Sequence, residues 1–138
     1  MEKALAVLEK QSPNFVKRGG CNSCHNQSLP SAALAIAKQH GIAGPKQIME
    51  MSREMREVSP ERHMELSAAA VNSMGYELLP LSLGKVPGDE YTEAVVHYMK
   101  MLQTPEGYWQ TPANRPPLSL DDVITTAMAA NALRTYAP

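Results

Sequence analysis

The stretch DDVITTAMAANALR, residues 121–134, gives the strongest indication of the fold. Small and apolar side chains occupy almost every side of it. Two acidic residues stand near its start, where the positive end of a helix dipole favours them. We therefore predict a helix over residues 119–135 that begins with Ser119. A helix that is apolar nearly all round is buried on several sides, so other helices must pack around this one.

Two kinds of predicted helix alternate along the chain. Apolar helices like 119–135 are expected over residues 28–40 and 60–78. Helices with one apolar stripe and one charged face are expected over residues 2–10, 45–58 and 89–103. Alternation of this kind is typical of outer and inner helices packed as hairpins. We predict an all-α fold of about six helices, arranged as a partial α/α toroid.

The composition agrees with a single helical domain, residues 1–138. The chain has 138 residues, a net charge of −1 and a pI near 6.4, which argues against a nucleic-acid partner. With one Trp, one Phe and nine Met, its core must be filled largely by methionine and alanine. No apolar run approaches the roughly 20 residues that span a bilayer, so we expect no membrane span.

A short motif before the last predicted helix carries a resemblance to a known family. QTPEGYW, residues 103–109, matches the Gln-x-x-x-Gly-x-Trp motif of squalene–hopene cyclase and prenyltransferase-like α/α toroids, and residues 121–134 resemble their inner helices. The resemblance implies the fold, and six helices would form about half of a complete toroid. It does not imply cyclase chemistry, because Ser119 stands where the first aspartate of the family's Asp-x-Asp-Asp acid would be. The aromatic lining is missing as well.

Both cysteines belong to one pattern, Cys21-Asn22-Ser23-Cys24-His25. Cys-x-x-Cys-His is the signature of covalent haem attachment, and here the chain resembles a c-type cytochrome. Two thiols three residues apart can each add to a vinyl group of the porphyrin, and the next histidine can bind the iron. We predict haem c and its iron on the connector 11–27, held through Cys21 and Cys24, with His25 as the proximal ligand.

Three other interpretations of the cysteines are weaker. A zinc site needs about four ligands, usually from separated pairs, and the chain has no second cysteine pair. A thioredoxin-like dithiol belongs in a βαβ context, which the sequence does not predict. A disulfide across two intervening residues would close too small a loop to stabilise much.

Topology narrows the choice of the distal ligand on the other side of the iron. The connectors from outer to inner helices are 11–27, 58–62 and the long loop 104–118, and they should all lie at one end of the array. His63 follows the second connector directly, so we expect it to be the distal ligand, with Met64 as the runner-up.

Two further histidines and one methionine are not expected to bind the iron. His40 and Met74 belong to the far ends of their helices, on the order of 18 Å or more from the motif at about 1.5 Å rise per residue. His97 falls beside the polar face of its helix, which indicates a surface position.

Four residues are candidates for the surroundings of the haem. Arg62 and Arg115 could pair with the propionates, because arginine favours carboxylates, although either could be a surface charge. Tyr108 and Trp109 are expected to line the haem edge. Packing within the repeat is the alternative for Trp109.

The sequence therefore predicts a monohaem c-type cytochrome domain for electron transfer, with an unidentified redox partner protein. A haem catalyst or a sensor of peroxide or gas, with an open distal site, is the alternative, so enzyme activity is left open. A haem-free helical interaction module is a third hypothesis. Haem attachment of this type implies a periplasmic or otherwise extracytoplasmic protein whose signal peptide has been removed. A homodimer or a missing partner domain would complete the toroid.

Overall fold

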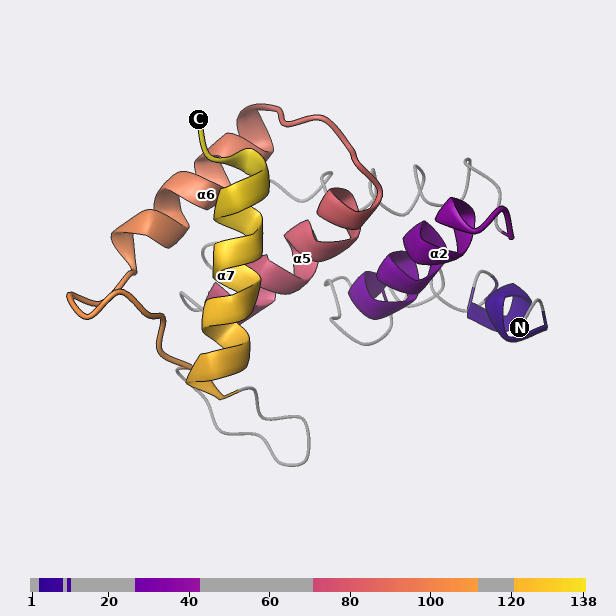
Figure 1. The fold of residues 1–138 in the computed structure, drawn as a ribbon, viewed down its shortest axis with the longest axis horizontal. Helices are drawn as coiled ribbons and strands as arrows, with labels where there is room; N and C mark the ends of the chain where they lie inside the picture. Colours follow the sequence, from indigo (N-terminus) through magenta and orange to yellow (C-terminus); the bar gives the residue numbers. More distant parts are fainter. Residues whose placement is uncertain (1–2, 9, 11–26, 43–70, 112–120) are drawn as a thin grey trace.

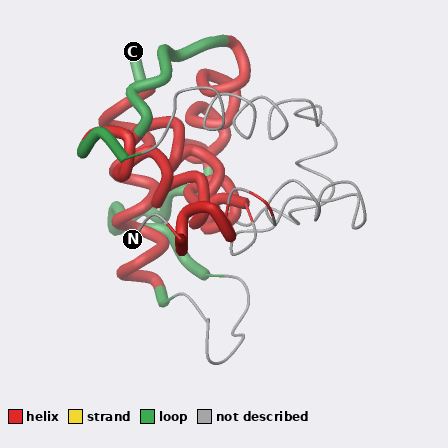
Figure 2. The backbone as a smooth tube through the Cα atoms, turned by 90° about the vertical axis from the view of Figure 1, so that its right-hand side faces the viewer, coloured by secondary structure: helices red, strands yellow, loops and turns green. Residues whose placement is uncertain are grey.

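The computed structural model describes residues 3–8, 10, 27–42, 71–111 and 121–138. Every regular element within those ranges is helical, which confirms the predicted all-α class (Figure 2). Residues 3–8 are helical, inside the predicted helix 2–10, whereas the predicted helix 45–58 lies outside the described residues. No helix in the described ranges is both long enough and apolar enough to cross a membrane.

Helix α2, Leu29–Gln39, matches the predicted helix 28–40 to within one residue at each end. Its end is set by Gly41, whose φ of 73° lies in the left-handed region that glycine adopts without strain. The Gly41 N–H donates to the Lys38 carbonyl at 2.9 Å, and the next N–H donates to the Ala37 carbonyl at 3.0 Å. This paired pattern satisfies carbonyls that the last helical turn would otherwise leave free.

Helix α5, Val71–Leu83, continues past residue 78, where the sequence analysis ended it. It accommodates Pro80 although proline lacks the N–H that a helix interior needs. Leu78, Pro80 and Leu81 are almost fully buried, and this burial keeps the last turn helical. The helix ends when Lys85 adopts a left-handed φ of 54°, in the same hydrogen-bonding pattern that ends α2.

Helices α6, Glu90–Met101, and α7, Asp122–Tyr136, both begin at an aspartate cap. Asp89 and Thr92 form a reciprocal capping box at the start of α6, where the sequence predicts Asp89 as the cap. At α7 the cap is Asp121, whose Oδ1 accepts the Ile124 N–H at 2.8 Å. The sequence predicts that this helix begins with Ser119, which lies outside the described residues, whereas the described helix has Asp121 as its cap.

Three helices, α2, α5 and α7, run in the same general direction (Figure 1). The Gln39 side chain donates to the Leu83 carbonyl at 2.7 Å, so α2 and α5 end together. Later along α5 and α7, the Asn131 amide donates to the Ser82 hydroxyl at 2.9 Å. Helix α6 returns in the opposite direction and packs against α5 and α7. The starts of α2, α5 and α7 therefore lie at one end of the array, as the predicted outer–inner alternation requires.

Two apolar clusters hold the helices together. The larger one joins α5, α6 and α7 and includes Leu78, Val96, Met99 and Ala129. The smaller one joins α2 to Leu5 and to Leu83 at the end of α5. Helix α5 contributes to both clusters, so it is the element that connects the two halves of the described structure (Figure 1).

Helix α7 is less enclosed than its sequence predicts. Its buried residues form one stripe that ends at Tyr136 and contains Thr125, Ala129 and Ala132. On its other side Val123 is 76% exposed and Ile124 is 43% exposed. Helices α5 and α6 pack against α7 but leave these two apolar side chains uncovered.

Candidate functional site

Most residues predicted to hold the haem lie outside the described part of the chain, namely Cys21, Cys24, His25, Arg62, His63, Met64 and Arg115. Their assignments stay predictions. Within the described ranges, no group of three or more His, Cys, Asp or Glu side chains is placed to hold a metal ion. The described residues that follow the Cys21–His25 motif in the sequence are those at the start of α2.

The chain enters α2 almost directly after the predicted proximal ligand. Gln27 follows His25 by two residues, so their Cα atoms lie within about 7 Å of each other along any path of the chain. Gln27 is only 3% exposed and Ser28 only 1% exposed, although both are polar. Ser28 occupies the N-cap position, but its side chain makes no capping hydrogen bond. A buried polar helix start thus borders the Cys-x-x-Cys-His motif.

Ser31, in the first turn of α2, is fully buried at 0% exposure. Its Oγ has no hydrogen-bond partner, and no other buried side-chain polar atom in the described ranges shares that condition. Burying a hydroxyl in this way costs about 1–3 kcal/mol, and buried polar groups in proteins nearly always have a partner. A polar substituent of a haem attached at Cys21 and Cys24 is one group that would provide a partner, and haem binding stays a prediction.

The loop that follows α6 is a tight turn built by the Gln-x-x-x-Gly-x-Trp motif. The Gly107 N–H donates to the Thr104 carbonyl at 2.9 Å, and the Thr104 N–H donates to the Tyr108 carbonyl at 2.9 Å. Gly107 has a φ of 92°, which glycine adopts readily. The Gln103 side chain donates to the Gly107 carbonyl at 2.9 Å and fixes the turn. Two of the three motif residues therefore have a local structural role.

Trp109, the third residue of the motif, connects the end of α6 to the start of α7. Its indole N–H donates to the Met99 carbonyl at 2.7 Å, and its backbone N–H donates to the Thr126 hydroxyl at 3.1 Å. The side chain is 3% exposed and belongs to the larger core cluster. Packing within the repeat, the alternative weighed from the sequence, thus accounts for most of its surface. Tyr108 is half-buried beside it, and its hydroxyl accepts from the Gln110 amide at 3.4 Å.

The start of α7 is hydrogen-bonded to the same loop, and these contacts were not predicted from the sequence. The Thr111 N–H donates to Asp122 Oδ1 at 2.8 Å, and the Thr111 and Thr125 hydroxyls are hydrogen-bonded at 2.7 Å. Thr126 lies within residues 121–134, the stretch that resembles an inner helix of the toroid family, so the sequence carried a signal for that residue. In Figure 1 this loop lies on the α6 and α7 side of the molecule, whereas α2 lies on the other side of α5. Contact of Tyr108 and Trp109 with a haem stays a prediction.

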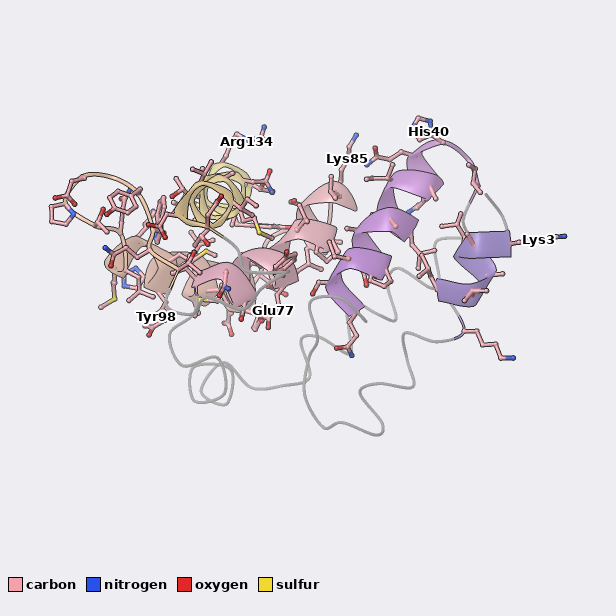
Figure 3. The ribbon with its side chains drawn as sticks, turned by 90° about the horizontal axis from the view of Figure 1, so that it is seen from below. Lys3, His40, Glu77, Lys85, Tyr98 and Arg134 are labelled. Carbon is pink, nitrogen blue, oxygen red and sulfur yellow. The ribbon has the colours of Figure 1, made fainter. Side chains whose placement is uncertain are left out.

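The three residues that the sequence excluded as iron ligands lie in different surroundings. His40 is exposed beyond the end of α2, opposite the helix start (Figure 3). Met74 is 4% exposed and packs in the larger cluster. His97 is exposed on α6.

Comparisons with protein families, curated proteins and solved structures returned no match for this chain.

Proposed function

We propose that this chain is a monohaem c-type cytochrome domain that transfers electrons. The observation that carries the proposal is the Cys21–His25 motif, which contains both cysteines of the chain. The buried, polar start of α2 supports it, because that helix begins beside the motif and holds a hydroxyl without a partner. When bound, the haem would supply a one-electron carrier, and the protein would hold it and control its access to water.

The residues divide by role. Cys21 and Cys24 attach the haem covalently, and His25 binds the iron from the proximal side. His63 is the distal ligand, with Met64 as the runner-up. A His/Met pair would raise the reduction potential relative to a His/His pair.

The surroundings of the haem come from two connectors. Arg62 and Arg115 pair with the propionates through their guanidinium groups. Tyr108 and Trp109 line the haem edge.

Covalent attachment is tested by producing the full chain together with the cytochrome c maturation machinery. We expect a red protein that keeps its haem in acidified acetone and gains the mass of one haem. The matched control is the Cys21→Ala/Cys24→Ala variant, which should stay colourless under the same conditions. A colourless unmodified chain would overturn the proposal and leave the haem-free interaction module as the surviving hypothesis.

The distal ligand is tested by His63→Ala, with the exposed His97→Ala as the matched control. Loss of the distal ligand should convert the reduced spectrum from low spin to high spin in the first variant only. An unchanged spectrum would transfer the assignment to Met64, which Met64→Ala then tests. A spectrum that is high spin before any substitution would favour the alternative function, a haem catalyst or a sensor of peroxide or gas.

We also propose that the helices form part of an α/α toroid completed by a second copy of the chain. The support is the uncovered face of α7, where Val123 and Ile124 are exposed. Sedimentation should give a dimer, and Val123→Glu should convert it to a monomer. A monomer at all concentrations would favour a missing partner domain.

Haem attachment outside the cytoplasm places the protein in the periplasm or another extracytoplasmic compartment. Cell fractionation of the full-length gene product tests this localisation, and recovery only with cytoplasmic markers would contradict it. The redox partner is a protein that remains to be identified by reduction kinetics with purified donors.

A further inference from the structure

We propose that the start of α2 binds a haem propionate, and that the Ser31 hydroxyl donates a hydrogen bond to that carboxylate. This proposal rests on the proposed function, since the haem supplies the propionate. Ser31 would be a third partner of the propionates, beside Arg62 and Arg115, which the sequence predicts for that role. Ser31 itself was not predicted from the sequence to have a role.

The first argument is the burial of polar groups at this helix start. Gln27, Ser28 and Ser31 are 3%, 1% and 0% exposed. They follow the attachment motif directly in the sequence, with Gln27 two residues after His25. Apolar residues are the usual occupants of such positions, and polar ones are kept where they have something to bind. Among the side chains that the structure describes, only the Ser31 Oγ combines full burial with the absence of a partner.

The second argument is charge. The first turn of α2 carries no acidic residue, whereas Lys38 stands in its last turn. The positive end of the helix dipole is therefore not compensated by a carboxylate in its own first turn, and a carboxylate from outside would be favoured there. A hydroxyl that donates to an anion forms a shorter and stronger hydrogen bond than one between neutral groups. Both features select an anion over a neutral ligand.

The proposal predicts that one substitution has opposite effects in the two states of the protein. Without haem, Ser31→Ala removes a hydroxyl that has no partner, so the folding equilibrium constant should stay the same or increase. With haem attached, the same change removes a hydrogen bond to a charged group. The folding equilibrium constant should then fall about tenfold or more.

The experiment measures urea denaturation of six samples, namely the parent and two serine variants, each with and without attached haem. Ser31→Ala is compared with its parent in the haem-loaded chain and in the Cys21→Ala/Cys24→Ala chain, which cannot attach haem. Ser82→Ala is the matched control, because the Ser82 hydroxyl already bonds the Leu79 carbonyl and the Asn131 amide, both at 2.9 Å. That control should lower the folding constant by the same factor in both states.

A second readout is the reduction potential of the loaded protein as a function of pH. Removing the donor raises the propionate pKa, so the pH at which the potential changes should be higher in Ser31→Ala than in its parent. The Ser82→Ala profile should match the parent.

Each outcome decides between the two proposals. A red protein in which Ser31→Ala acts with the same sign in both states overturns the propionate site and leaves the proposed function intact. A chain that never acquires haem overturns both, because the carboxylate then has no source. A fall in the folding constant that occurs only in the loaded protein, together with the shifted pH profile, establishes the site.

Discussion

Gly75 lies in α5 at the point where α7 crosses that helix. Because glycine has no side chain, the two helices can approach each other closely there. A glycine within a helix costs about 1 kcal/mol relative to alanine, so its presence needs a reason. The reason is steric, because a Cβ added at Gly75 would stand 2.8 Å from Met128 Cβ and 3.7 Å from the Met128 carbonyl carbon. Carbon atoms pack at about 3.5–4.0 Å, so the two helices would have to separate by roughly 1 Å.

Replacing Gly75 with alanine therefore sets two opposing effects against each other. The gain in helix propensity is about 1 kcal/mol. Overpacking costs typically 1–3 kcal/mol, and the upper value applies here because both atoms are fixed directly to their backbones and cannot rotate away. The net effect is a loss of about 2 kcal/mol in the free energy of unfolding. Urea denaturation with an unchanged m-value would report this loss as a lower midpoint.

Substitutions at Met128 test whether the contact between the two Cβ atoms is responsible. Met128→Ala keeps its Cβ, so Gly75→Ala should remain destabilising in that background. Met128→Gly removes the Cβ, so in that background Gly75→Ala should stabilise by about 1 kcal/mol. An increase in stability from Gly75→Ala in the natural sequence would show that α5 and α7 do not approach as closely as described.

Three further changes should shift stability in defined directions, each measured by urea or thermal denaturation. Lys85→Gly should raise the free energy of unfolding by about 1 kcal/mol, because Lys85 has a left-handed φ that glycine adopts without strain. Gly41→Ala, at the matching position after α2, should lower it by a similar amount. Effects of the same sign at the two positions would contradict the shared geometry. Trp109→Phe should cost about 1 kcal/mol because the Met99 carbonyl loses the indole donor and keeps only the Leu102 N–H at 3.1 Å, and a neutral result would show that the indole bond contributes little. Asp89→Ala should cost about 1 kcal/mol through loss of the capping box, and Asp89→Asn should retain most of that stability if capping rather than charge is responsible.

The sequence predicted the helices well where local chemistry sets their limits. The proline and glycine around α2 and the aspartate at the start of α6 act within one turn, and the structure agrees with them there. The end of α5 was wrong because burial of Leu78 and Leu81 overrides the interruption that Pro80 would otherwise cause. Burial in the folded core depends on distant residues, so a single helix pattern does not reveal it.

The same limit applies to the candidate site. Gln103, Gly107 and Trp109 were recognised as a motif, but their hydrogen bonds within the turn and to α6 became visible only in the structure. Ser31 carries no signal in the sequence, because a serine in the first turn of a helix is ordinarily exposed. Its importance comes from the complete burial that packing of α2 against its neighbours produces.

Trp109 is the only tryptophan in the chain, and its burial makes it a natural optical probe. Indole fluorescence reports on polarity and on nearby absorbers, so this single fluorophore reports on the joint between α6 and α7 alone. In the haem-free variant its emission should be blue-shifted, as expected for an indole shielded from water. In the loaded protein a haem beside the loop would quench that emission by energy transfer. The ratio of the two intensities thus measures how near the haem lies to the turn that precedes α7.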